Sequence, residues 1–234
     1  MLFRSPAFLE LLGIPYTGSD PLTLAATLDK DVAKRLCRDA GVATPGWVLV
    51  DGDVAAVDAQ LLALRPPFIV KPAFEGSSKG VLSAISVVAC HEDLPATIAR
   101  FADSYRQPIL VEEFIDGDEL TVGVVGNGRP RVVGVMRVLP RRQTDDRPFV
   151  YSIEVKRDWE RLVRYECPAR ISEQAFRAVE EATLACWRTL GCRDVSRFDF
   201  RLRDGVPYFL EVNPLPGLSD RKSTRLNSSH QIIS

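Results

Sequence analysis

The chain has 234 residues, and its 30 Lys and Arg side chains nearly balance 31 Asp and Glu, giving a formal net charge of −1. This balance gives no sign of a nucleic-acid or membrane partner, and no apolar run approaches the roughly 20 residues of a membrane-spanning helix. Hydrophobic residues make up 46% of the chain, enough for one large core or two smaller ones. The five cysteines include no C-x-x-C pair, so we expect reduced thiols in a cytoplasmic protein.

The first half of the chain alternates between helix and strand patterns. Asp20 and Pro21 offer an N-cap and a first helical position, and the apolar spacing predicts one helix that runs to Gly41 and carries Lys30 and Lys34 on one face. Apolar runs predict strands at 47–50, 68–71, 81–88 and 109–113, with a Gly/Ser loop before the third. A helix is expected over 92–105.

The second half begins with a turn-rich connection at 114–118, where we place a boundary between two lobes. Strands are expected at 120–125 and 131–138, and a polar loop at 141–147. Ser172 can cap a helix whose apolar residues follow the 3.6-residue period until Gly191. We expect this helix to pack on the final sheet.

The last two strands, 196–202 and 206–213, both alternate and predict a hairpin. A two-residue Asp204-Gly205 turn would pair Arg203 with Val206 and mix polar with apolar residues on each face. A three-residue loop with Gly205 left-handed pairs Leu202 with Val206 and separates the faces, so we expect this loop. The predicted core face comprises Phe198, Phe200, Leu202, Val206, Tyr208, Leu210 and Val212. The predicted polar face comprises Arg197, Asp199, Arg201, Phe209, Glu211 and Asn213.

The polar face of this hairpin is a candidate metal site. It gathers the oxygens of Asp199, Glu211 and Asn213 beside the guanidinium of Arg197, a combination that suits Mg²⁺ with a phosphate. A solvated face of salt bridges explains the same pattern equally well. The pattern alone leaves both interpretations open.

Six motifs bear on this choice, because they occur in the order found in D-alanine–D-alanine ligases of the ATP-grasp superfamily. They are LLGIPYTG at 11–18, DK at 29–30, IVKP at 69–72, EGSSKG at 75–80, EEFIDG at 112–117 and EVNPLPG at 211–217. The chain resembles this family over 8–219. The resemblance implies an α/β ATP-grasp fold, with two α+β lobes that sandwich ATP and a remnant of an N-terminal Rossmann-like domain. The expected divisions are 1–29 for the remnant, 30–118 for the central lobe and 119–219 for a truncated C-terminal lobe.

The resemblance also implies a reaction: ATP-dependent ligation of two D-alanines through an acyl phosphate, which gives D-alanyl-D-alanine for peptidoglycan precursors. ATP, D-alanine and two Mg²⁺ ions, or Mn²⁺ in their place, are the implied ligands, and a homodimer stays open for the intact enzyme. The implied nucleotide-binding residues are Lys30, Lys71, Glu75, Ser77, Ser78, Glu112, Phe114, Ile115, Glu119 and Lys156. The implied metal ligands are Asp199, Glu211 and Asn213, and the implied catalytic groups are Arg197, Gly217 through its backbone N–H, Ser77 and Lys156.

Three features depart from the family pattern, two of them at single positions. Arg157 stands where many members carry an aromatic residue that closes the second-substrate pocket, and Lys222 stands where a serine is expected. Groups of the first-substrate site lie upstream of Met1, so we expect this chain to be inactive alone. The alternatives are another ATP-grasp carboxylate–amine ligase, a D-alanine–D-lactate ligase and a non-catalytic ATP-binding module.

The two ends of the chain carry separate expectations. Residues 220–234, beginning DRKSTRLNSSH, resemble a translated sequencing adapter, so we expect native sequence to stop at Ser219 and treat 220–234 as an artefact outside the fold. Near the other end, the apolar segment 8–14 is expected to be exposed and to promote aggregation.

Overall fold

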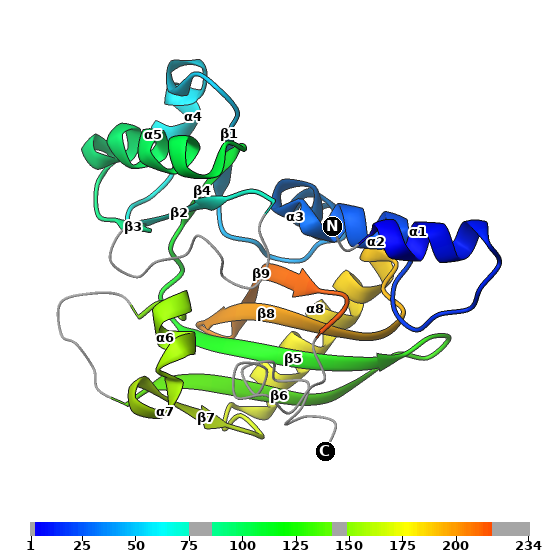
Figure 1. The fold of residues 1–234 in the computed structure, drawn as a ribbon. Coiled ribbons are helices and arrows are strands. Elements are labelled where there is room, and N and C mark those ends of the chain that lie inside the picture. The colour runs from blue at the N-terminus through cyan, green and yellow to red at the C-terminus, as the bar shows by residue number, and fades with distance from the viewer. Residues whose placement is uncertain (1–2, 75–85, 142–148, 217–234) are drawn as a thin grey trace.

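The computed structural model describes residues 3–74, 86–141 and 149–216, and within them the strands form two antiparallel sheets, one above the other in Figure 1. The smaller sheet has the order β1 (Trp47–Val50), β4 (Ile109–Glu113), β2 (Phe68–Pro72), β3 (Val87–Val88). The larger sheet has the order β7 (Val163–Glu166), β6 (Arg131–Pro140), β5 (Asp118–Gly126), β8 (Asp194–Arg203), β9 (Val206–Asn213). These strands confirm those predicted from the sequence at 47–50, 68–71, 109–113, 120–125 and 131–138.

Helices cover one face of the smaller sheet. They are the 3-10 turns η1 (Val54–Val57) and η2 (His91–Asp93), and the helices α4 (Asp58–Leu62) and α5 (Leu94–Tyr105). Phe68 and Val70 of β2 pack with Ile98 and Phe101 of α5 in one core, because alternate strand residues point to the same face. The opposite face, which carries Lys71 and Glu112, is therefore turned away from this core. The helix predicted over 92–105 is confirmed, with a 3-10 turn at its start.

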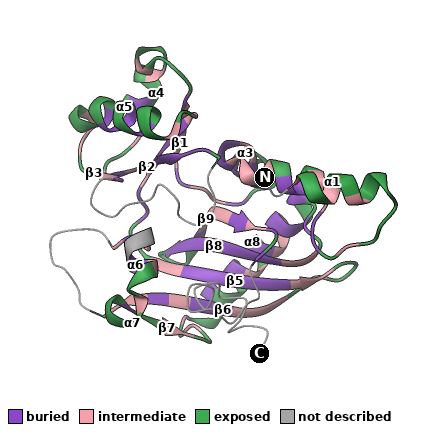
Figure 2. Ribbon diagram, in the orientation of Figure 1, coloured by how far each residue is buried: buried purple, intermediate pink, exposed green. Residues whose placement is uncertain are grey.

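The larger sheet has its own core beneath α8 (Glu173–Leu190), which lies behind β5 and β8 in Figure 1. The Ser172 side chain accepts from the Ala175 N–H at 3.1 Å, and Gly191 ends the helix at φ 69°. Both ends of α8 are as predicted. Figure 2 shows buried stretches that run along β5 and β8, the strands in front of α8.

The helix predicted from Asp20 to Gly41 is wrong as one element, because the chain forms α2 (Pro21–Leu28) and α3 (Lys30–Asp39). Asp29 between them has an extended backbone, and its side chain accepts from the N–H groups of Asp31 and Val32. Such a cap competes with continuation of the first helix. The break leaves the Lys30 N–H to donate to the Ala73 carbonyl at 3.2 Å, which fixes the start of α3 beside the end of β2.

The α3 helix packs on the larger sheet. Ala33, Cys37 and Val42 belong to the core that also contains Trp187 of α8 and Phe209 of β9. The lobe divisions at 1–29, 30–118 and 119–219 stay predictions. The described part of the chain has no helix that is long and apolar enough to cross a membrane.

The final hairpin differs from its predicted turn. Asp204 and Gly205 have φ of 52° and 80°, and Arg203 pairs with Val206, so the turn has two residues and the three-residue loop was wrong. This geometry matches the twist of the two strands. A β-bulge then shifts the register, because Phe200 pairs with Phe209 whereas Asp199 pairs with Glu211.

The bulge explains which hairpin residues are buried. Phe209, predicted on the polar face, is fully buried opposite Phe200, while Val206 and Tyr208, predicted in the core, are exposed and half-buried. Leu210, the extra residue of the bulge, is also only half-buried. Beyond the bulge the predicted face is restored, so Asp199 and Glu211 lie together as expected.

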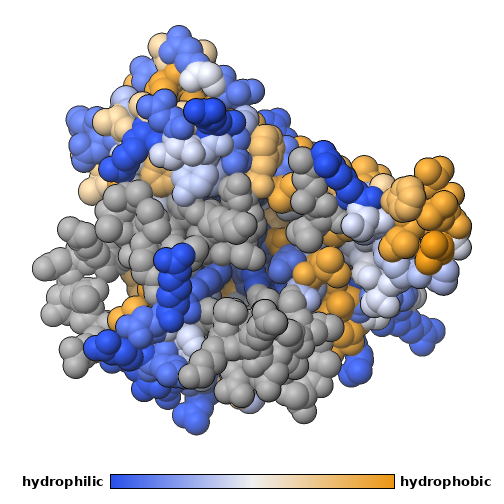
Figure 3. Space-filling view, in the orientation of Figure 1, coloured by the Kyte–Doolittle hydropathy of each residue, from blue (hydrophilic) through white to orange (hydrophobic). Residues whose placement is uncertain are grey.

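The remaining helices of the described residues lie at the periphery of the molecule (Figure 1). They are α1 (Arg4–Leu11), α6 (Ile153–Arg157) and α7 (Trp159–Leu162). Around α1, Phe8, Leu11, Leu12 and Ile14 are 61%, 81%, 54% and 45% exposed, and Figure 3 shows the resulting apolar patch at the right of the molecule. The predicted exposure of 8–14 is confirmed, and its effect on aggregation stays a prediction.

Candidate functional site

A buried group of three charged side chains joins the two sheets. Lys34 of α3 is fully buried, and its Nζ lies 3.0 Å from Glu112 Oε2 and donates to the Phe209 carbonyl at 3.3 Å. Lys71 of β2 donates to Glu112 Oε1 at 2.6 Å. Lys34 therefore links β4 of the smaller sheet to β9 of the larger one.

The charge of Glu112 depends on these two lysines. Burial by itself would raise the pKa of Glu112, but the charges of Lys34 and Lys71 and their hydrogen bonds lower it to about 2. Burial lowers the pKa of Lys34, and Glu112 is the main influence that opposes this. The three side chains are thus interdependent, and removal of Glu112 would leave the buried charges of Lys34 and Lys71 without their shared partner.

Carboxylates of the larger sheet form the second part of the site. Asp199 of β8 lies directly opposite Glu211 of β9, and Arg197 lies opposite Asn213. Asp199 accepts from Thr121 Oγ1 at 2.9 Å and from Arg197 Nη2 at 2.8 Å. These bonds hold the Asp199 carboxylate in one orientation beside Glu211.

Cations from four different elements act on Glu211. Burial would raise its pKa, but Lys30 of α3, Lys156 of α6, Lys71 of β2 and Arg197 of β8 together lower it. The structure therefore brings together side chains that are up to 181 positions apart in the sequence. Such a concentration of positive charge beside a carboxylate pair favours polyanionic ligands with a bound cation.

Lys156 approaches this cluster from α6. Its Nζ lies 5.0 Å from the centre of the Tyr151 ring, and the Tyr151 and Tyr165 hydroxyls are 2.7 Å apart. Burial and the charge of Arg197 lower the pKa of Lys156, while Glu211 opposes them. The aromatic contact fixes the lysine at the edge of the site.

The connection between the sheets holds the predicted adenine and ribose residues. Phe114 and Ile115 are buried, and Glu119 of β5 forms an ion pair with Arg201 Nη2 at 2.9 Å. Gly117 has φ 155°, and a Cβ there would lie 2.3 Å from the Leu202 carbonyl oxygen. A glycine is therefore required for the connection to pass so close to β8.

Most of the predicted site residues lie in two neighbouring parts of the structure. The structure gathers Lys30, Lys71, Lys156, Arg197, Asp199, Glu211 and Asn213 around the facing sheets, with Glu112, Phe114, Ile115 and Glu119 beside or at the connection. Glu75, Ser77, Ser78 and Gly217 lie outside the described residues. Three further residues, Lys34, Thr121 and Arg201, have no predicted role. Two of them carried a signal in the sequence: Lys34 lies on the same helical face as Lys30, and Arg201 belongs to the predicted polar face of the final hairpin.

The oxygens of Asp199, Glu211 and Asn213 fit a hard cation such as Mg²⁺. Carboxylate oxygens retain further lone pairs after accepting the bonds described above, while Asn213 Oδ1 already accepts from the Leu215 N–H at 3.1 Å. Among the described residues, no three His, Cys, Asp or Glu side chains form a metal-binding group. A cation here would therefore depend on two carboxylates, an amide and oxygens of a bound ligand.

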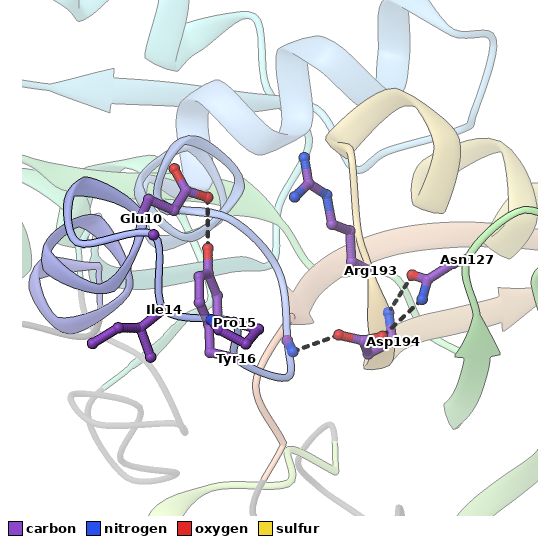
Figure 4. Close-up of a pocket in the computed structure, with 9 residues that line it drawn as sticks. Glu10, Ile14, Pro15, Tyr16, Asn127, Arg193 and Asp194 are labelled. Atoms are coloured by element: carbon purple, nitrogen blue, oxygen red, sulfur yellow. Dashed lines mark hydrogen bonds between the residues drawn. The ribbon is translucent and has the colours of Figure 1, made fainter.

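A separate pocket lies where the loop after α1 meets β5 and β8 (Figure 4). Asp194 accepts from the Gly18 N–H at 2.6 Å and from Asn127 Nδ2 at 2.8 Å, and the Tyr16 hydroxyl donates to Glu10 at 2.7 Å. These polar groups of the wall are paired with one another. None of the predicted site residues lines this pocket.

Solved structures share this architecture. The structure matches the D-alanine–D-alanine ligase of Bacillus anthracis complexed with ATP at a TM-score of 0.71 and 24% identity, covering 97% of this chain and 68% of that one. It matches the VanG D-Ala:D-Ser ligase of Enterococcus faecalis at a TM-score of 0.76 and 27% identity, covering 96% and 64%. The fold is the ATP-grasp fold, as predicted.

Sequence relatives agree with this. The chain is 38% identical to the D-alanine–D-alanine ligase of Ralstonia nicotianae over 90% of its own length, and 33% identical to that of Acidovorax ebreus over 97%. It spans 61% and 65% of the lengths of these two relatives. The profile of the family described as "D-ala D-ala ligase C-terminus" matches residues 36–227. Because this match covers well over half of the sequence, the chain belongs to the D-Ala–D-Ala ligase C-terminal family.

Proposed function

We propose that the chain provides the ATP-binding and catalytic lobes of an enzyme that ligates two D-alanines at the expense of ATP, giving D-alanyl-D-alanine for peptidoglycan precursors. The observation that carries this proposal is the set of four cations, Lys30, Lys71, Lys156 and Arg197, whose charges act on Glu211 opposite Asp199. A solvated salt-bridge face would not bury Lys30, Lys71 and Arg197 together. The cytoplasm, where ATP is available, is the proposed compartment, and a homodimer is the proposed assembly.

The proposed reaction has two steps, and each develops negative charge. A carboxylate oxygen of the first D-alanine attacks the γ-phosphorus of ATP, and ADP leaves. The amine of the second D-alanine then attacks the acyl carbon, phosphate leaves, and the nitrogen loses a proton as the amide forms. Positioned cations and N–H groups that meet this charge lower both barriers.

The roles of the residues follow from their charge and place. Lys30, Lys71 and Lys156 would hold the phosphates, and Arg197 would stabilise the oxyanion with the backbone N–H of Gly217. Glu112, with Phe114 and Ile115, would hold the adenine, and Glu119 the ribose. Ser77 and Ser78, with Glu75, belong to the proposed phosphate loop outside the described residues.

Asp199, Glu211 and Asn213 would hold two Mg²⁺ ions, or Mn²⁺. Bound there, the cations would neutralise charge on the phosphates. Thr121 and Arg197 keep the Asp199 carboxylate oriented for this task. Arg197 thereby serves both the carboxylate and the reacting centre.

The identity of the acceptor depends on the residue at position 157. Arg157 is exposed at the end of α6, where the family pattern has an aromatic residue. D-Alanine is the proposed acceptor, with D-lactate and D-serine as competitors. Each acceptor is distinguished by whether it stimulates release of ADP and by the product it gives.

The first test is nucleotide binding by titration calorimetry with ATP and Mg²⁺, followed by ADP release with D-alanine, D-lactate, D-serine or L-alanine. We expect Mg²⁺-dependent binding of ATP and, in a protein that contains the first-substrate groups, release of ADP stimulated by D-alanine. Glu211→Gln should abolish release and leave much of the adenine contact. Undiminished release by this variant would refute the metal assignment, and tight ATP binding without any release would favour a non-catalytic ATP-binding module.

A further inference from the structure

We propose that Arg201 is a positioning residue of the nucleotide site, which holds the Glu119 carboxylate for the ribose and ties it to the segment leading into α6. The inference rests on the proposed function, since Glu119 contacts a ribose only if the chain binds ATP. In the sequence, Arg201 appears only as one member of the polar face of the hairpin. The structure gives it four partners.

The first partner is Glu119 itself. Arg201 and Glu119 are direct cross-strand partners on β8 and β5, and their side chains are only 6% and 13% exposed. Arg201 lies on the same face of β8 as Arg197 and Asp199, because residues two apart on a strand share a face. Its guanidinium therefore belongs to the face of the larger sheet that carries the candidate metal ligands.

The other three partners are two backbone carbonyls and the ring of a residue proposed to hold the adenine. Arg201 Nη1 donates to the Gly117 carbonyl at 2.9 Å, and Nη2 donates to the Phe149 carbonyl at 2.6 Å. The guanidinium carbon lies 5.0 Å from the centre of the Phe114 ring. A planar guanidinium with five donors can hold all of these groups at once, which a lysine cannot.

Glu119 depends on this arrangement. Burial raises the pKa of Glu119, and Arg201 is the strongest opposing influence. A backbone hydrogen bond from Tyr151 also favours the ionised form. Because Arg201 contacts Phe149 and Glu119 contacts Tyr151, the pair holds two positions of the segment that leads into α6 and Lys156. Loss of Arg201 should disturb the ribose contact and the approach of Lys156 together.

The test compares ATP with 2′,3′-dideoxy-ATP, which lacks both ribose hydroxyls, by titration calorimetry in the presence of Mg²⁺. We expect the wild-type chain to bind ATP about tenfold more tightly, the effect of a hydrogen bond to a charged group. Arg201→Met should weaken ATP binding and reduce this preference to less than about threefold. If Arg201 had a purely structural role, its replacement would weaken the binding of both nucleotides equally. Arg203→Met is the control, since Arg203 is exposed on the same strand and contacts Tyr208.

The outcomes separate this inference from the proposed function. A folded Arg201→Met protein that keeps the wild-type preference for ATP overturns the role of Arg201 and leaves the function intact. If Arg201→Met does not fold, Arg201→Lys keeps the charge but cannot reach all the acceptors, and an unchanged preference in that variant overturns the role as well. A wild-type chain that binds neither nucleotide overturns the proposed function and this inference with it.

Discussion

Replacement of Glu112 by Gln should strongly destabilise the protein, because Glu112 is the shared partner of two lysines. The substitution keeps the size of the side chain and removes only its charge. Lys34, which is fully buried, and Lys71 would then face a neutral amide. Breaking a buried ion pair by removing one partner typically costs about 3–5 kcal/mol.

The lowered pKa of Glu112 gives a second value for the free energy that its ion pairs contribute to folding. A fall from 4.5 to about 2 corresponds to about 3 kcal/mol, at roughly 1.4 kcal/mol for each pH unit. Since the pKa in the folded state lies below that in the unfolded state, this stabilisation is complete above about pH 4.5 and is lost as the pH falls towards 2. This free energy agrees with the lower end of the cost expected for breaking a buried ion pair.

Urea denaturation of the wild type and of Glu112→Gln measures this difference. We expect a gap of about 3 kcal/mol at pH 7 that narrows steadily below pH 4.5. Lys34→Met should cost less, because Lys71 stays on Glu112. Glu173→Gln is the control, since its ion pair with Arg177 is exposed and should contribute less than about 1 kcal/mol. A gap below 1 kcal/mol at pH 7, or one that persists unchanged at pH 3, would refute the reasoning.

Three further predictions concern other parts of the molecule. Gly117→Ala should lower the urea midpoint far more than Gly205→Ala. A Cβ at Gly117 would lie 2.3 Å from the Leu202 carbonyl oxygen, whereas one at Gly205 meets nothing within 4 Å. Equal decreases of the urea midpoint in the two variants would contradict this. Thr121→Val should weaken Mg²⁺-dependent ATP binding severalfold by freeing Asp199, measured by calorimetry, while binding without Mg²⁺ stays the same. Leu11→Glu should reduce aggregation in light scattering, since Leu11 is 81% exposed in the apolar patch, and unchanged scattering would exclude this patch as the cause.

The final hairpin shows why the sequence alone predicted only part of the site. Alternation placed Asp199 and Glu211 on one face, which the structure confirms, but the same alternation gave the wrong turn. Two local features, a two-residue turn and a compensating bulge, produce nearly the same result as one three-residue loop. A periodic pattern cannot distinguish them, because each restores the same alternation beyond the bulge.

The break at Asp29 has a similar cause. The apolar spacing from Leu24 to Leu36 continues across the break, and the pattern therefore predicted one helix. The competing cap is a single side-chain interaction, and the Lys30 N–H finds its acceptor in Ala73, 43 positions away. Helix periodicity contains no information about such a distant acceptor.

By itself the sequence predicted most of the strands, the caps of α8, the family and a set of candidate ligands, because these depend on local periodicity and on ordered motifs. It did not predict β7, and of the strand expected at 81–88 the structure describes Val87–Val88 as β3. Only the tertiary structure decided that Lys34 joins Glu112 to the Phe209 carbonyl, and that Thr121 and Arg201 hold Asp199 and Glu119. These contacts cross between strands and sheets that lie far apart in the chain. Their energies arise from burial and charge, which exist only once the two sheets have come together.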